Sequence, residues 1–303
     1  MFDKLYSKNE VVKSSLIKDI KLVIKREDKL HEHISGNKYR KLKYNLITAK
    51  EKGHTKLLTF GGAYSNHIAA TAAAGNEYGF ETIGIIRGDE LADKIDENPT
   101  LRFAKKCGMQ FKFVTREYYR IKTSEEFINS LYNEFGNIYI LPEGGTNNLA
   151  VKGCEEILTE EDAEFDYVCT AVGTGGTIAG LINSAKKHQK VLGFPALKGE
   201  FLTKEIKKIC IPSDNWKLIH DYHYRGYGKI NNQLIAFINQ FKQETNIPLD
   251  PVYTGKMLYG IVDMILKGDF KKGSKILAIH TGGLQGIEGM NMKLQRQGLY
   301  LIN

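Results

Sequence analysis

Short apolar runs and longer amphipathic segments alternate along most of the chain. The runs are mostly β-branched or aromatic and do not alternate strictly with polar positions, which is typical of parallel strands covered on both faces. They predict strands at 56–60, 81–87, 110–115, 138–142, 166–172, 190–196, 217–222 and 275–280. Helical patterns occupy 65–79, 99–107, 124–135, 176–188, 202–209, 231–243 and 255–267. This alternation predicts a doubly wound α/β architecture.

Glycine-rich turns follow several of the predicted strands. They stand in "TFGGAYSNH", "AVGTGGT" and "LAIHTGG", and ligands of open α/β sheets bind at such strand ends. The turn at 173–177 predicts a phosphate cup, because glycine lets the backbone approach a ligand and a helix N-terminus offers free N–H groups. It is neither a Walker loop nor a G-x-G-x-x-G motif, so an ordinary strand–helix turn stays open as an alternative. In the turn at 61–67, an N-cap role alone would be enough to explain Ser65 or Asn66, so this alternative to ligand binding stays open.

Length and charge narrow the class of protein. The chain has 303 residues, enough for about two domains, and a net charge of +8. A basic protein raises the question of nucleic acid, but the lysines are spread along the chain and are not interleaved with aromatic residues. We therefore do not expect nucleic-acid binding. A non-catalytic module that binds an anion through its basic surface stays open as the competing class.

The remaining bulk features predict a cytoplasmic protein. The four cysteines (Cys107, Cys154, Cys169 and Cys210) lack the spacing of a metal or redox motif, which favours buried free thiols in a reducing compartment. The first residues, "MFDKLYSKNEVVKSSL", contain acids and have no apolar signal core. No run approaches the roughly 20 apolar residues of a membrane span.

The stretch "HISGNKYRKLKYNL" (33–46) contains a lysine in an unusual position. If 37–52 is a helix, with about 100° between residues, Lys38 points along the apolar face with Leu42 and Leu46. Arg40 and Lys43 would point to solvent, where we expect them to be ordinary solvated charges. A lysine aimed at the interior is rare unless it is paired or chemically used. Desolvation lowers the pKa of a lysine and raises the fraction of free amine that a Schiff base requires.

The motifs "SGNKYRKL", "GGAYSNH", "GTGGT", "DPVYTGK" and "HTGG" follow one another in the chain. In this order they resemble the pyridoxal-phosphate enzymes of the tryptophan-synthase-β type, and within them the D-cysteine desulfhydrase and 1-aminocyclopropane-1-carboxylate (ACC) deaminase branch. The resemblance implies two open twisted sheets with helices on both faces, known as fold type II. It also implies a large cofactor-binding domain (1–47 and 153–303), a small inserted α/β domain (48–152), and a homodimer.

The resemblance implies a role for each motif residue. Lys38 would hold pyridoxal 5′-phosphate, and no metal would be needed. The other cofactor-binding residues would be Asn66, Gly173, Thr174, Gly175, Gly176, Thr177 and Thr281. The catalytic residues would be Lys38, Ser65, Tyr227 and Tyr253. The residues facing a small amino-acid substrate would be Ser65, Asn66, His67, Tyr227, Tyr253 and Thr254.

Two positions bear on which reaction the resemblance implies. In ACC deaminases a glutamate follows the tyrosine of "PVY", and an apolar residue stands near the pyridine nitrogen. Here these positions are Thr254 and Thr281, which resemble the desulfhydrases. The implied activity is therefore β-elimination from D-cysteine to pyruvate, sulfide and ammonia, with Lys38 removing the α-proton. ACC deamination and elimination from D-serine stay open as alternatives.

Overall fold

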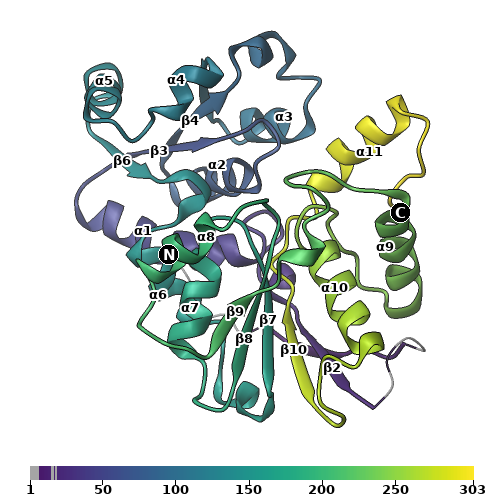
Figure 1. Cartoon of the computed structure of the whole chain (residues 1–303). Helices are drawn as coiled ribbons and strands as arrows, with labels where there is room; N and C mark the ends of the chain where they lie inside the picture. The colour runs from purple at the N-terminus through teal and green to yellow at the C-terminus, as the bar shows by residue number, and fades with distance from the viewer. Residues whose placement is uncertain (1–6, 15–16, 18) are drawn as a thin grey trace.

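The computed structural model describes residues 7–14, 17 and 19–303 of the chain. These residues form two lobes, each built around its own sheet, with the helix α1 (Asn37–Glu51) running between them (Figure 1). The prediction of two open sheets with helices on both faces is confirmed. The exact division at residues 48 and 152 stays a prediction.

The larger sheet is mostly parallel. Its strand order is β1 (Asn9–Val11), β2 (Lys21–Lys25), β10 (Lys275–Ile279), β7 (Tyr167–Val172), β8 (Lys190–Pro195) and β9 (Trp216–Leu218). Only the edge pair β1–β2 is antiparallel among these strands. Because neighbouring strands are parallel, their carboxyl ends share one edge, and the turns after β7 and β10 come together there.

Helices cover both faces of the larger sheet. One face packs against α9 (Asn232–Thr245) and α10 (Thr254–Lys267), and the other packs against α7 (Gly176–Ser184) and α8 (Phe201–Lys207). The helix α6 (Asn148–Glu155) joins the second group and lies along α1. Each face has a separate cluster of buried Leu, Ile, Val and Phe side chains, as expected for strands covered on two sides.

The smaller sheet is entirely parallel. Its order is β5 (Gln110–Val114), β4 (Glu81–Arg87), β3 (Lys56–Gly61) and β6 (Ile138–Leu141). The helices α2 (Asn66–Tyr78) and α3 (Pro99–Lys106) pack on one side, and α4 (Arg116–Arg120) and α5 (Glu125–Phe135) pack on the other. The helix α11 (Gly286–Arg296) belongs to the C-terminal part of the chain but reaches toward this lobe (Figure 1).

Most predicted elements are present, and the errors are local. The strand predicted at 217–222 ends at Leu218 and gives way to a 3-10 turn at His220–Tyr222. The strands β1 and β2 and the helices α4 and α6 were not predicted. These elements are short or polar, so they carry little hydrophobic periodicity.

The expectation that Arg40 and Lys43 are solvated is wrong. Arg40 is buried and forms a two-pronged ion pair with the buried Glu27, with distances of 2.9 and 3.0 Å. Lys43 is half-buried and binds Glu156 at 2.6 Å. Burial alone would lower the pKa of Arg40, but the hydrogen bonds and charge of Glu27 outweigh it and raise that pKa. The face of α1 that looked solvated is covered by α6, which the sequence did not reveal.

Candidate active site

Gly36 sets the start of α1 and hence the position of Lys38. Its φ is +60°, and a Cβ atom there would lie 2.0 Å from the carbonyl oxygen of Thr281. That same carbonyl accepts the N–H of Asn37, so the helix begins against the end of β10. Only glycine fits this close approach of two backbones. The "SGNK" and "HTGG" motifs are therefore one structural unit, although they are distant in the sequence.

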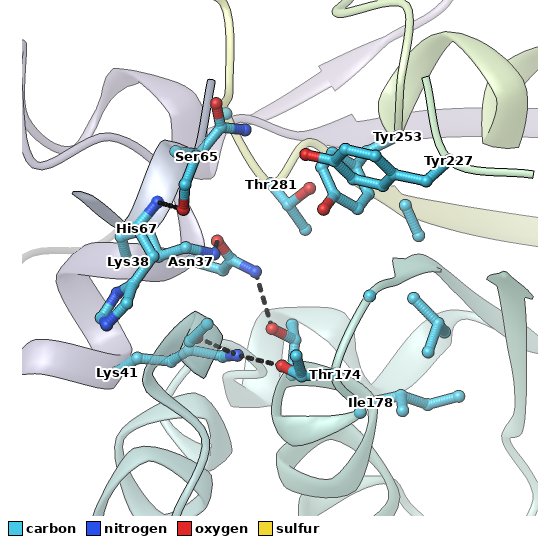
Figure 2. A pocket seen from close by; sticks show the side chains of 18 residues that line it. Asn37, Lys38, Lys41, Ser65, His67, Thr174, Ile178, Tyr227, Tyr253 and Thr281 are labelled. Atoms are coloured by element: carbon cyan, nitrogen blue, oxygen red, sulfur yellow. Dashed lines mark hydrogen bonds between the residues drawn. The ribbon is translucent and has the colours of Figure 1, made fainter. Parts of the chain in front are cut away.

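Lys38 lies in the first turn of α1 and lines a pocket between the two lobes (Figure 2). Its ammonium nitrogen donates to Asn37 Oδ1 at 3.1 Å. Burial, and after it the charge of the nearby Lys41, lowers the pKa of Lys38 to about 7. Near neutral pH a large fraction of this amine is therefore unprotonated, as a nucleophilic amine requires.

The turn after β7 forms a cup at the N-terminus of α7. Gly175 has a φ of +89°, and a Cβ atom on it would lie 2.8 Å from Ile206, so glycine is needed here. Thr177 accepts a hydrogen bond from Asn37 Nδ2 at 2.8 Å, which ties this cup to the helix that carries Lys38. Thr174 lines the pocket on the same side (Figure 2).

Lys41 adds a buried cation to the cup. Its ammonium nitrogen lies 3.0 Å from the carbonyl oxygen of Gly144, 2.9 Å from Thr146 Oγ1 and 3.5 Å from Thr174 Oγ1. Burial lowers the pKa of Lys41. No carboxylate among the described residues forms an ion pair with Lys41. Its partners are neutral oxygens from both lobes. A buried cation without a counter-ion, beside a helix N-terminus, suits a phosphate group.

The loop after β3 brings Ser65, Asn66 and His67 to the pocket. The Ser65 hydroxyl accepts the N–H groups of His67 and Ile68, so the N-cap interpretation of Ser65 is confirmed. The side-chain oxygen of Asn66 accepts a hydrogen bond from Gln285 at 2.5 Å, which links α2 to the turn before α11. All three residues also line the pocket, which is compatible with contacts to ligands. Their individual roles toward ligands stay predictions.

His67 is a buried, neutral side chain. Burial lowers its pKa well below the ordinary range, and the charges of Lys38 and Lys41 add to this. Its Nε2 lies 2.8 Å from the hydroxyl of Thr59, which itself donates to the carbonyl of Leu141. The single hydroxyl proton is thereby used, so Nε2 must carry the ring proton. Nδ1 then holds a lone pair, so it cannot donate a hydrogen bond to a substrate carboxylate.

Tyr227 and Tyr253 lie together on the side of the pocket opposite Ser65 and His67 (Figure 2). Their ring centroids are 6.1 Å apart. Tyr253 is held by Asp250, whose carboxylate accepts the N–H of Tyr253 at 2.9 Å. A Cβ atom on Gly173 would lie 3.3 Å from the Tyr253 ring, so this small residue leaves room for the aromatic side chain.

Thr254 does not reach the pocket. It is fully buried, and its hydroxyl donates to Asp250 Oδ1 at 2.8 Å. Asp250 also accepts three backbone N–H groups, so its acceptor sites are occupied by its own turn. This placement favours an indirect role for Thr254, through the turn that holds Tyr253, over the direct substrate contact that was expected.

Lys256 fastens the turn that presents Tyr227. It is buried, and its ammonium nitrogen donates to the carbonyls of His223 and Gly226 at 3.1 and 3.0 Å. Tyr224 and Arg225 in this turn have φ values of +52° and +66°, which are strained for non-glycine residues. Burial lowers the pKa of Lys256 to about 8. The lysine thus offsets the cost of a strained turn beside the pocket.

The structure gathers nearly all the predicted site residues around one pocket. The predicted residues that line it are Lys38, Ser65, Asn66, His67, Gly173, Thr174, Gly175, Thr177, Tyr227, Tyr253 and Thr281. Gly176 lies directly behind the lining, where a Cβ atom would meet Thr146 and Lys41. Among the described residues that line the pocket, none is an aspartate or a glutamate.

Three residues that line the pocket were not predicted from the sequence. Lys41 and Asn37 both line the pocket, and neither was predicted to do so. Gly144 was missed as well, although "LPEGGT" repeats the pattern of a glycine pair after a predicted strand. The 3-10 turn Glu143–Gly145 that follows β6 delivers this glycine to the pocket. The same strand-end rule that found the other turns would have found this one.

The donor set fits pyridoxal phosphate. The cofactor needs an amine that is partly unprotonated and a site for a phosphate dianion, and the pocket supplies Lys38 for the first and the cup with Lys41 for the second.

Among the described residues, no cluster of His, Cys, Asp or Glu could hold a metal ion. None of the described helices is long and apolar enough to cross a membrane. Cys154 and Cys169 are buried thiols, whereas Cys107 and Cys210 are only partly buried.

Comparison with known proteins identifies the family. Residues 5–282 match the model of the pyridoxal-phosphate-dependent enzymes. A putative ACC deaminase of Pyrococcus horikoshii is 33% identical over 87% of this chain and 84% of its own length. A bifunctional D-cysteine desulfhydrase/ACC deaminase of Arabidopsis thaliana is 32% identical over 88% of this chain and 73% of its own length.

A solved structure agrees with this assignment. The crystal structure of an ACC deaminase homologue superposes with a TM-score of 0.81 at 29% identity, covering 96% of this chain and 94% of that one. The chain therefore belongs to the pyridoxal-phosphate-dependent enzymes, and within them to the family of ACC deaminases and D-cysteine desulfhydrases.

Proposed function

We propose that this pyridoxal-phosphate-dependent enzyme is a D-cysteine desulfhydrase, which converts D-cysteine to pyruvate, sulfide and ammonia by β-elimination. The observation that carries the proposal is the absence of a carboxylate among the described residues that line the pocket. Thr281 presents a neutral hydroxyl there, Thr254 is turned away, and Asp250 is occupied by its own turn. Without a carboxylate beside it, the pyridine nitrogen of a bound cofactor would stay unprotonated, which would suit elimination of a β-thiolate.

Lys38, the cup and Lys41 would hold the cofactor. Lys38 would form the covalent link, while residues 173–177 and Lys41 would bind the phosphate. Asn66 and Thr281 would face the ring. When bound, pyridoxal phosphate supplies an electron sink for the carbanion at the substrate α-carbon.

The protein's own residues then handle the substrate and its protons. Once the substrate amine has replaced Lys38 in the covalent link, the freed Lys38 Nζ would take the α-proton, because it lies on the pocket wall and its low pKa makes the free amine available near neutral pH. Ser65 lies on the side where the substrate carboxylate would bind. Tyr227 and Tyr253 cover the opposite side and keep water away from the reacting atoms. The β-sulfur leaves as sulfide, and hydrolysis of the remaining enamine gives pyruvate and ammonia.

ACC deamination is the second candidate, since several relatives carry that name. The bifunctional name of the Arabidopsis relative supports keeping both reactions in one test. D-serine is the third candidate substrate, because it offers the same β-leaving position with oxygen in place of sulfur. A cytoplasmic homodimer completes the proposal, and light scattering would measure the oligomeric state.

A substrate panel tests the proposal. Purified enzyme loaded with pyridoxal phosphate would be given D-cysteine, L-cysteine, D-serine and ACC, with pyruvate, sulfide and 2-oxobutyrate each measured. We expect pyruvate and sulfide from D-cysteine, and none from the Lys38→Ala variant. Formation of 2-oxobutyrate from ACC without pyruvate from D-cysteine would replace the desulfhydrase with a deaminase.

A further inference from the structure

A second hollow lies at the carboxyl edge of the smaller sheet, outside the pocket around Lys38. It is lined by Arg87, Arg116, Tyr119, Arg120, Lys122 and Glu143. Arg87 ends β4, α4 follows β5, and Glu143 follows β6, so several strand ends converge on it. Ligands of parallel sheets bind at this edge. None of these side chains is needed by the cofactor site.

Tyr119 is the floor of the hollow. Its ring is buried and packs edge-on against Phe60, and its hydroxyl donates to Glu143 at 2.9 Å. The guanidinium of Arg87 lies 5.7 Å from the ring centroid, and the ammonium of Lys122 lies 4.8 Å from it. One rigid ring therefore positions two cations, which limits the entropy that either loses when it binds a ligand.

The charges around this floor are unbalanced. Four cationic side chains face one carboxylate in the lining. Lys122 pairs with Glu143 at 3.2 Å, and Arg116 pairs with Glu90, which lies outside the lining. Arg87 and Arg120 form no ion pair with any described residue. Like charges gathered in one hollow repel one another, so a bound anion would lower the electrostatic energy of the hollow.

We propose that this hollow is a binding site for a small multivalent oxyanion of the phosphate class. Arginine suits such a ligand, because its planar fork can donate two parallel hydrogen bonds to neighbouring oxygens. The backbone also leaves space, since a Cβ atom on Gly62 would come no closer than 3.6 Å to the Arg87 guanidinium. The site is adjacent to the cofactor pocket through the step from Glu143 to Gly144, but its cations are separate from Lys41.

Equilibrium dialysis with radiolabelled inorganic phosphate tests the proposal. The enzyme is first loaded with pyridoxal phosphate so that the cup is filled, and sodium chloride holds the ionic strength constant. The test variant is Arg87→Ala/Arg120→Ala. The matched control is Lys50→Ala/Arg296→Ala, which removes two exposed cations from α1 and α11. Because all four side chains are exposed, both variants should fold, and circular dichroism would check this.

We expect saturable phosphate binding to the loaded enzyme and to the control variant. Arg87→Ala/Arg120→Ala should weaken it by about tenfold or more, since the variant removes two donors of charge-assisted hydrogen bonds. Absence of saturable binding to the loaded enzyme would overturn the proposal. Equal weakening in the two double variants would also overturn it, because the effect would then come from net charge alone.

Discussion

The low pKa of Lys38 can be measured directly in cofactor-free protein. Acetic anhydride reacts only with unprotonated amines, so the extent of labelling follows the neutral fraction of each lysine. The structure puts the pKa of Lys38 at about 7, first because of burial and then because of the charge of Lys41. Labelling of Lys38 should therefore rise with pH through a midpoint near 7.

The expected effect is large. At pH 7 about half of the Lys38 amine would be neutral, whereas an ordinary lysine with a pKa near 10.4 is neutral in only about one molecule in 2,500. Brief labelling over a range of pH, followed by peptide mass spectrometry, gives the profile of each lysine in one experiment. The exposed Lys50, on the same helix, serves as the internal reference.

A variant tests the cause as well as the value. Replacing Lys41 by methionine removes a like charge, so it should raise the Lys38 midpoint above that of the unmodified protein. A Lys38 midpoint above 9 in the unmodified protein would refute the argument from burial. An unchanged midpoint in Lys41→Met would refute the contribution assigned to its neighbour.

Two predictions concern stability, each measured as the free energy of unfolding in urea. Glu27→Gln removes the buried counter-ion of Arg40 and leaves only the more distant Glu156, at 3.7 Å, so it should cost about 3–5 kcal/mol. A loss below about 1 kcal/mol would contradict a buried, coupled pair. Gly36→Ala should cost far more than Gly53→Ala: both have positive φ, but only the first would drive a Cβ atom into the carbonyl of Thr281. Gly53→Ala should cost about 1–2 kcal/mol, and equal losses would contradict the steric argument.

The sequence predicted the fold well wherever hydrophobic runs were long. Strands such as β4 and β7 each have five consecutive buried positions, and most of the residues at these positions are apolar, so the hydrophobic run is easy to recognise in the sequence. The edge strand β1 has three residues, and two of them are polar or charged. Its pairing with β2 depends on distant parts of the chain, which periodicity within a segment does not record.

The residues of the functional site also fall into those that local sequence patterns identify and those that depend on distant contacts. Glycine turns at strand ends and the phase of α1 identified Lys38 and the cup, because both signals are local. The environment of a side chain is not local. Arg40 is two residues from Lys38 and looked solvated, yet Glu27 and Glu156 surround it in the folded chain. Lys41 likewise becomes part of the cup only because Gly144 and Thr174 converge from the two lobes.

If Lys38 carries the cofactor, the linkage between the two can be trapped chemically and located in the sequence. Borohydride reduction of the enzyme loaded with pyridoxal phosphate would make the link between amine and cofactor permanent, and peptide mass spectrometry would locate it. A phosphopyridoxyl group should be found on Lys38 and on no other lysine. Its attachment to Lys41 or to another lysine, or its absence from the reduced protein, would contradict the role of Lys38 as the residue that binds the cofactor.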